Sequence, residues 1–457
     1  MSTNGTMFEQ NKEKIGTLEK VSYGLGDLGN GMMFQLAQLY LLKFYTDILG
    51  ISAYWGGMIF LVTKIFDAIT DTLVGTYVDS RKVGPKGKFR PFILYGTGFL
   101  AASTVLAFFA PDLNEGAKVV FAFATYNLMS LAYTVVNIPY GSLSSAMTVD
   151  SGERTSLAVF RNLGGTAASL IAGIVVLPLV NLFNSPKLGY PVAIAILSLF
   201  GVAFHLVCYR NTKERFISTK ERVKGDGLRS VKSLLTNKEF LVLAVYTVLS
   251  VGAMFLKMGM QLYYFQYVLG NEGLVGVVST LNILALLPSV FLATPLVKKI
   301  GKKNLSVFGM LFFGIFEIVN YLFAGDNVTF FLVVNACSYM FLSFANTVSF
   351  AFVGDLIDYT QWKDGLRSEG IIYSGYSFVR KISQAVAGFV PGIALTVIGY
   401  VANQQQTADT ISGLQGTYFL IPAVASFIGI VIFFFGYTLT DEKHAKVTEE
   451  LRERNEL

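Results

Sequence analysis

The stretch Lys64-Ile-Phe-Asp67-Ala-Ile-Thr70-Asp71 places two carboxylates inside a run of residues that is otherwise apolar enough to cross a membrane. Residues i, i+3 and i+4 share one face of an α-helix, so Asp67, Thr70 and Asp71 present clustered oxygen atoms. An ionised carboxylate in hydrocarbon costs several kcal/mol unless it is paired or hydrated, so such acids usually serve an ion or proton path. The stretch predicts a membrane-spanning helix that faces a wet cavity and binds a proton or Na⁺. The alternative is a purely structural ion pair between Asp67 and Lys64, which lies one turn away on a neighbouring face.

The composition indicates an all-α integral membrane protein. The chain has 457 residues, of which 53% are hydrophobic and 14% charged, whereas soluble domains carry about 25% charged residues. The net charge of +6 is concentrated in loops, so we expect no nucleic-acid partner. The sequence contains no metal-ligand cluster, no nucleophile–base pair and no phosphate-binding glycine loop, and we therefore expect neither a cofactor nor an enzymatic activity.

Twelve apolar segments are predicted to be membrane-spanning helices. They cover approximately residues 22–46, 52–77, 91–110, 118–144, 157–181, 189–209, 239–268, 273–297, 304–324, 328–353, 371–400 and 414–438. The loops alternate in charge: one set is rich in lysine and arginine, whereas the opposite set holds only Lys118 and Lys187. Basic loops stay in the cytoplasm, so both termini are predicted to be cytoplasmic.

A basic stretch at 210–238 separates two halves of six segments and holds nine lysine or arginine residues against three acidic ones. We predict a cytoplasmic N-terminus at 1–21, a first six-helix bundle at 22–209, a second bundle at 239–438 and a cytoplasmic tail at 439–457. Matched halves of six are the layout of the major facilitator fold. The alternative is an unrelated twelve-helix enzyme or assembly protein.

The first segment carries a polar stripe at near-helical spacing. It comprises Asp27, Asn30, Gly31, Gln35 and Gln38. The stripe either lines a substrate cavity or packs against neighbouring helices through hydrogen bonds and a small residue.

Candidate substrate ligands also occur on the fourth and fifth segments. Thr134 and Asn137 share a helix face, next to the aromatic Tyr133, and Pro139 removes a backbone donor there. Arg161 lies inside an apolar run, where its side chain either extends to the interface or faces the bundle interior. We predict the interior position for Arg161.

The second half carries charges at comparable depths. Lys381 lies about 15 Å from the start of its segment, near the membrane midplane, so it is predicted to face a wet cavity or a carboxylate. Arg380 points about 100° away from it, and Gln384 follows one turn later. Lys257 either binds substrate or forms a structural pair with Glu317.

Two further sets of charges lie near the ends of segments. Lys43, at the outer end of the first segment, is expected to extend its ammonium group to the membrane surface. On the cytoplasmic side, the basic loops, including Arg90, and the acids Asp355 and Asp358 are expected to form gating ion pairs that break and reform between states.

Seven motifs in register resemble the glycoside–pentoside–hexuronide:cation symporters, from about residue 19 to 437. The motifs are Tyr23-Gly-Leu-Gly-Asp27-Leu-Gly-Asn30, Phe44-Tyr-Thr-Asp47, Asp67-Ala-Ile-Thr-Asp71, Gly87-Lys-Phe-Arg-Pro91, Asn137-Ile-Pro-Tyr-Gly-Ser-Leu143, Asp355-Leu-Ile-Asp-Tyr359 and Phe378-Val-Arg-Lys381. The resemblance implies secondary active transport of a glycoside with H⁺, Na⁺ or Li⁺ by alternating access.

In the melibiose permease branch of that family, the cation-binding positions correspond to Asp67, Thr70, Asp71 and Thr134. The sugar-binding positions correspond partly to Arg161 and Lys381. The chain departs from that branch at Gly31, Asn137, Gly141 and Asn346, where melibiose permease has acidic or tryptophan residues of the sugar site. Three stretches look more like the xyloside and glucuronide carriers, which are thought to use protons: Gly26-Asp27-Leu-Gly-Asn30, Asn137-Ile-Pro-Tyr-Gly-Ser-Leu143 and the pair Arg380-Lys381.

We therefore expect a proton-coupled symporter, acting as a monomer in a bacterial cell membrane, that imports a xyloside or other pentoside-containing saccharide, or a glucuronide. The predicted substrate-binding set is Asp27, Asn30, Gly31, Tyr133, Asn137, Arg161, Lys257, Asn346, Arg380, Lys381 and Gln384. The alternatives are a Na⁺-coupled symporter of a galactoside or another sugar, a lysolipid symporter, and a sugar sensor that does not transport.

Overall fold

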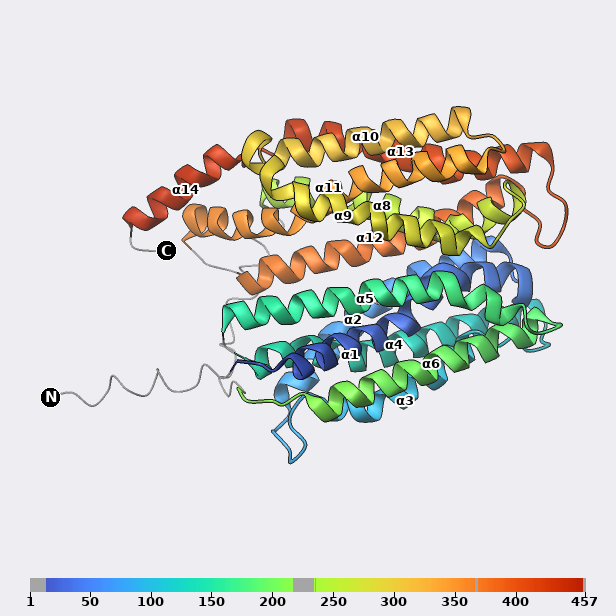
Figure 1. Cartoon of the computed structure of the whole chain (residues 1–457), viewed down its shortest axis with the longest axis horizontal. Coiled ribbons are helices and arrows are strands. Elements are labelled where there is room, and N and C mark those ends of the chain that lie inside the picture. Colours follow the sequence, from blue (N-terminus) through green and yellow to red (C-terminus); the bar gives the residue numbers. More distant parts are fainter. Residues whose placement is uncertain (1–13, 149, 217–233, 235, 366–368, 455–457) are drawn as a thin grey trace. The chain divides into compact units, whose positions relative to one another are not determined.

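The computed structural model describes residues 14–148, 150–216, 234, 236–365 and 369–454. In this part of the chain the secondary structure is helical and includes no β-strand (Figure 1). Packing divides the chain into two compact units. One unit comprises Met1–Ala37 and Ile69–Glu221, and the other comprises Gln38–Ala68 and Arg222–Leu457. The far ends of the first two helices therefore pack with the second half of the sequence.

The first unit is built from six helices, of which α2 contributes only its second part. They are α1 (Thr17–Leu36), α2 (Ala53–Ser80), α3 (Arg90–Ala107), α4 (Glu115–Met147), α5 (Ser151–Val180) and α6 (Pro186–Asn211). Within this unit α1 packs against α5 and α6, and α3 packs against α4 and α6.

The second unit begins with two π-helical stretches that continue α1 and with the first part of α2. Its elements are η1 (Ala37–Leu41), η2 (Phe44–Leu49), α8 (Lys238–Tyr267), α9 (Leu274–Ile300), α10 (Lys302–Phe323), α11 (Val328–Asp364), α12 (Glu369–Val397), α13 (Ala408–Gly436) and α14 (Asp441–Glu453). Within this unit α13 lies beside both α8 and α10, and α12 lies beside α8 (Figure 1).

The twelve predicted segments all fall on helices, which confirms an all-α membrane protein. Among the described residues, seven helices are long and apolar enough to span a membrane, and the bent α9 adds an eighth. The largest deviation is α11, which continues to Asp364, beyond the predicted end at 353. The extension is polar but remains helical because α14 packs against it. Most of the predicted 210–238 linker lies outside the described residues.

A carboxylate that follows α6 caps the start of α3 in the first unit. Glu214 accepts hydrogen bonds from the backbone N–H groups of Lys88, Phe89 and Arg90, at 2.7, 2.9 and 2.8 Å. The Arg90 guanidinium donates to the carbonyl oxygen of Tyr209 near the end of α6. The three bonds to Glu214 satisfy backbone N–H groups at the start of α3 that have no partner within the helix.

The second unit repeats this arrangement after its own last membrane helix. Asp441 accepts a hydrogen bond of 2.7 Å from the backbone N–H of Lys302 at the start of α10. The Lys303 ammonium donates to the carbonyl oxygen of Tyr437, just after α13, at 2.7 Å. The two halves of the sequence thus carry equivalent closing contacts, as expected for an internal repeat.

The α1–α5 contact in the first unit depends on glycine. A Cβ atom added to Gly164 would lie 2.1 Å from the carbonyl oxygen of Gly24, and one added to Gly24 would lie 2.6 Å from that of Phe160. The two helices therefore touch through their backbones, which is the packing that small residues permit in membrane helices.

Substitution of Gly164 by alanine is predicted to force α1 and α5 apart and to destabilise the first unit by about 1–3 kcal/mol. The measurement is thermal unfolding in detergent, followed with a thiol-reactive dye that reports exposure of the buried Cys208. Gly98→Ala is the matched control, because an added Cβ meets no atom within 4 Å there. Equal unfolding temperatures for the two variants would contradict this account of the contact.

Candidate functional site

The acidic residues of α2 have different partners. Asp71, in the first unit, accepts a hydrogen bond from the hydroxyl of Thr134 on α4, with an O–O distance of 2.8 Å. Asp67, in the second unit, is 6% exposed and accepts a hydrogen bond from the Lys64 ammonium at 3.1 Å. Thr70 is also buried. Asp71 is thus held by a neutral donor and Asp67 by a cation.

Asp67 has a second basic neighbour within the second unit. Lys381 on α12 is close enough to interact electrostatically with both Asp67 and Lys64. The predicted midplane lysine therefore meets a carboxylate. Because one carboxylate serves two ammonium groups, a proton or Na⁺ on Asp67 would compete directly with them.

The first unit contains a partly exposed ion pair between α1 and α5. The Arg161 Nε atom donates to Asp27 Oδ1 at 3.2 Å, and the two side chains are 36% and 19% exposed. The Arg161 guanidinium also lies over the ring of Tyr140, 5.3 Å from its centroid. Its terminal nitrogens have no hydrogen-bond acceptor in the described part of the chain. Arg161 therefore faces the protein interior with donor capacity unused.

The polar stripe of α1 divides between two roles. Asn30 donates a hydrogen bond of 3.4 Å to Asn137 on α4. A Cβ atom added to Gly31 would lie 2.4 Å from the Cβ of Ala168, so Gly31 packs against α5. Tyr133 stacks on Phe34 with a ring separation of 4.9 Å. Asn30 thus joins Asn137 in a polar contact between α1 and α4, whereas Gly31 lies in a helix–helix contact with α5.

Lys257 and Glu317 form a fully buried pair in the second unit. Both side chains are 0% exposed, and the Lys257 Nζ atom lies 2.6 Å from each carboxylate oxygen. Asn335 accepts a further hydrogen bond from Lys257, and Ser338 donates one to Glu317. The Lys257 ammonium also lies over the Tyr418 ring at 4.6 Å. This is the structural pairing left open as the alternative for Lys257.

The remaining substrate candidates of the second unit have separate environments. The Arg380 guanidinium lies over the ring of Phe350, 5.4 Å from its centroid. Gln384 is half-buried one turn beyond Lys381. Asn346 has a buried side-chain oxygen without a hydrogen-bond partner in the described residues. Among the predicted residues of this unit, only Lys381 is seen to interact with the acid on α2.

The predicted gating residues are engaged inside their own units. Arg90 holds the end of α6, as described above. Asp355 on α11 accepts a hydrogen bond from Lys302, and His444 of α14 contacts both Asp355 and Asp358. Asp358 lies 3.0 Å from His444 Nε2. Whether these pairs rearrange during transport stays a prediction.

The expectation for Lys43 was wrong. Its side chain is 6% exposed and forms an ion pair of 3.0 Å with Asp47, whose side chain is 5% exposed. The i, i+4 spacing of Lys43 and Asp47 was a usable signal in the sequence. The pair is enclosed by Tyr263, Tyr267 and Tyr400, which come from distant parts of the sequence. The sequence therefore did not reveal that the pair is buried. Within the described residues there is no group of three or more metal-ligating side chains.

Comparison with known proteins agrees with this architecture. The chain is 40% identical over 99% of its length to an uncharacterized symporter of Bacillus subtilis, YjmB, of which it covers 99%. It is 39% identical to a putative sulfoquinovose importer of Escherichia coli, with 96% of this chain and 95% of that protein aligned. It is 32% identical to the glucuronide carrier protein homolog of Escherichia coli, with 96% of each chain aligned.

A solved structure shares the fold at low sequence identity. A variant of the nucleoside transporter NupG superposes with a TM-score of 0.67 and 12% identity, covering 92% of this chain and 100% of that one. The family model for MFS/sugar transport proteins matches residues 22–441. The chain therefore belongs to the MFS/sugar transport protein family, and it is a multi-pass membrane transporter, not an enzyme.

Proposed function

We propose that this protein is a cation-coupled symporter that imports an acidic sugar or its glycoside. The names of two relatives specify anionic sugars: sulfoquinovose carries a sulfonate, and a glucuronide carries a carboxylate. Of the two substrate classes expected from the sequence, this supports the glucuronide class over the neutral xylosides.

The proposal rests mainly on the environment of Arg161. It lies about 15 Å along α5, within the part of the helix that is apolar enough to span a membrane. Only its Nε atom is bonded, to Asp27, while more than a third of the side chain is exposed. A guanidinium offers paired, parallel N–H donors that match a carboxylate or sulfonate. Asp27, Asn30 and Asn137 would then hydrogen-bond sugar hydroxyl groups.

The acids of α2 would couple transport to the cation. Asp67 neutralises Lys64 and lies within electrostatic range of Lys381, so a proton or Na⁺ on Asp67 changes the charge balance of the second unit. Asp71, bonded to the Thr134 hydroxyl, offers oxygen ligands in the first unit. A cation and a sugar that each favour the same conformational state raise one another's affinity. Both termini would be cytoplasmic, since the basic loops lie on their side.

Replacement of Arg161 by glutamine is predicted to weaken transport of an acidic sugar at least tenfold, because a charge-assisted bidentate contact is worth roughly 1.5–3 kcal/mol. The measurement is counterflow in proteoliposomes with methyl glucuronide, sulfoquinovose and methyl glucoside. Methyl glucoside is the neutral control and is expected to be a poor substrate of both proteins. Preferential transport of neutral xylosides or glucosides by the unaltered protein would refute the acidic-sugar proposal.

Replacement of Asp67 or Asp71 by asparagine is predicted to abolish accumulation of sugar against a gradient while leaving exchange measurable, because the coupling charge is lost. Uptake would be measured in proteoliposomes with imposed pH or Na⁺ gradients, which also identifies the cation. Asp112→Asn is the matched control, because Asp112 is exposed in a loop. Undiminished accumulation in both α2 variants would exclude these carboxylates from coupling, and binding without accumulation by the unaltered protein would indicate a sensor.

A further inference from the structure

A buried charge cluster joins the far end of the α1 region to the second half of the chain. The Lys43 ammonium contacts Asp47 at 3.0 Å, Glu272 at 3.5 Å and the side-chain oxygen of Gln266. Lys43 and Asp47 belong to the first half of the sequence, whereas Gln266 and Glu272 flank the end of α8. All of these residues lie within one packing unit. The cluster therefore cross-links two halves of the sequence at this end.

Tyrosine side chains enclose the cluster. The Lys43 ammonium lies over the rings of Tyr263 and Tyr267, at 5.3 and 5.2 Å from their centroids. The Tyr400 hydroxyl, from beyond the end of α12, donates to Asp47 at 2.8 Å. Asn403, which has a positive φ of 57°, donates to the backbone carbonyl of Asp47 at 2.6 Å. Asp47 thus gathers contacts from the loop between α12 and α13 as well as from Lys43.

The cluster lies in a π-helical part of the chain. Residues Phe44–Leu49 form the π-helical η2, and η2 ends at Gly50, whose φ of 76° only glycine adopts without strain. Short π-helical stretches occur frequently at functional sites, where they change the direction of side chains relative to a regular helix. Both the distorted helix and the left-handed Asn403 are local costs that the contacts of Asp47 offset.

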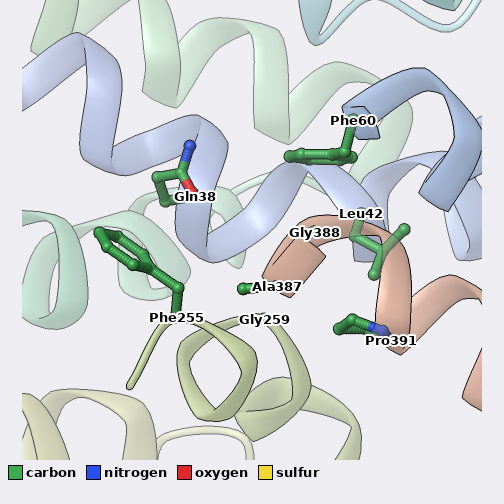
Figure 2. A pocket seen from close by; sticks show the side chains of 8 residues that line it. All are labelled: Gln38, Leu42, Phe60, Phe255, Gly259, Ala387, Gly388 and Pro391. Atoms are coloured by element: carbon green, nitrogen blue, oxygen red, sulfur yellow. The ribbon is translucent and has the colours of Figure 1, made fainter. Parts of the chain in front are cut away.

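An apolar layer lies next to the cluster. It is formed by residues that come before the cluster residues in the α1 region, in α8 and in α12. A small pocket there is lined by Gln38, Leu42, Phe60, Phe255, Gly259, Ala387, Gly388 and Pro391 (Figure 2). On each of the three chain segments the pocket residue precedes the cluster residue: Leu42 before Lys43, Gly259 before Tyr263 and Pro391 before Tyr400. The pocket therefore lies between the cluster and the level of Asp67 and Lys381.

The backbones of α2 and α12 touch beside this layer. A Cβ atom added to Gly392 would lie 2.5 Å from the carbonyl oxygen of Ala53, and one added to Gly57 would lie 2.9 Å from that of Phe389. Such an approach leaves no room for a water path between these two helices. The layer behind the charge cluster is therefore closely packed where α2 meets α12.

We propose that Lys43 and Asp47, with Tyr400 and the two tyrosines of α8, form the latch that closes the transporter on the side opposite its N-terminus. In the closed state every charge of the latch is paired away from water. Opening this side requires α8 and the α12 end to leave Lys43 and Asp47, which then exchange their protein partners for water. The latch sets how often this side opens, whichever sugar or cation is carried.

The test measures access from outside to a cysteine placed at Gln38, beneath the latch. The protein carries Gln38→Cys with both native cysteines replaced by alanine, and a membrane-impermeant maleimide is added on the side opposite the N-terminus. Lys43→Met is predicted to speed labelling about tenfold, since loss of the pair shifts the two-state equilibrium toward opening. Tyr400→Phe, which removes one hydrogen bond, is expected to give a smaller increase.

The matched control is Lys187→Met, because Lys187 pairs with Asp112 at 2.9 Å but the two side chains are 53% and 92% exposed. Its labelling rate is expected to equal that of the parent protein. If Lys43→Met does not fold, the double variant Lys43→Met/Asp47→Asn, which does not leave the Asp47 carboxylate without Lys43, and Tyr400→Phe decide the question. Unchanged labelling in the folded variants, or rapid labelling of the parent, would overturn the latch. Since the readout needs no sugar, it stands apart from the transport assays.

Discussion

A charged group inside a membrane must keep its counter-charge within reach, and this constraint organises the whole protein. Four cations, Lys43, Lys64, Arg161 and Lys257, meet an acid inside their own packing unit, and the degree of burial differs between the pairs. Lys257 and Glu317 are sealed completely, whereas Arg161 and Asp27 remain partly exposed. Sealed pairs with all hydrogen bonds satisfied favour a permanent structure, while exposed pairs remain available for exchange with a ligand.

The degree of burial distinguishes charges that serve packing from charges that stay accessible to a ligand better than their position in the sequence does. Lys257 and Lys381 both interrupt apolar helices of the second half, and both were predicted to bind substrate. Lys257 is enclosed by a carboxylate, an amide and aromatic rings, which leaves no donor for a sugar. Lys381 is only half-buried and shares Asp67 with Lys64. The same residue type is thus sealed into a structural pair in one place and left accessible in the other, where its role in ligand binding stays a prediction.

The sequence was sufficient for the helices, because long apolar runs and alternating basic loops leave few other arrangements. It also singled out Asp67, Asp71 and Arg161 as candidates, since charges in such runs are rare enough to stand out, and their roles stay predictions. It failed for Lys43, whose neighbours Tyr263 and Tyr400 lie more than two hundred residues away in the chain. It also did not reveal that Gln38–Ala68 packs with the second half. The burial of Lys43 and the packing of Gln38–Ala68 both depend on long-range contacts that no local sequence pattern encodes.

The duplicated carboxylate caps have a consequence for biosynthesis. The first cap is complete once Glu214 has left the ribosome, before any helix of the second half exists, so most of the first unit is able to assemble during translation. The segment Gln38–Ala68 is made early but belongs to the second unit, so its partners are synthesised later. Until α12 arrives, lipid or the insertion machinery must shelter Lys43 and Asp47. Nascent chains are therefore most vulnerable to quality control at this segment.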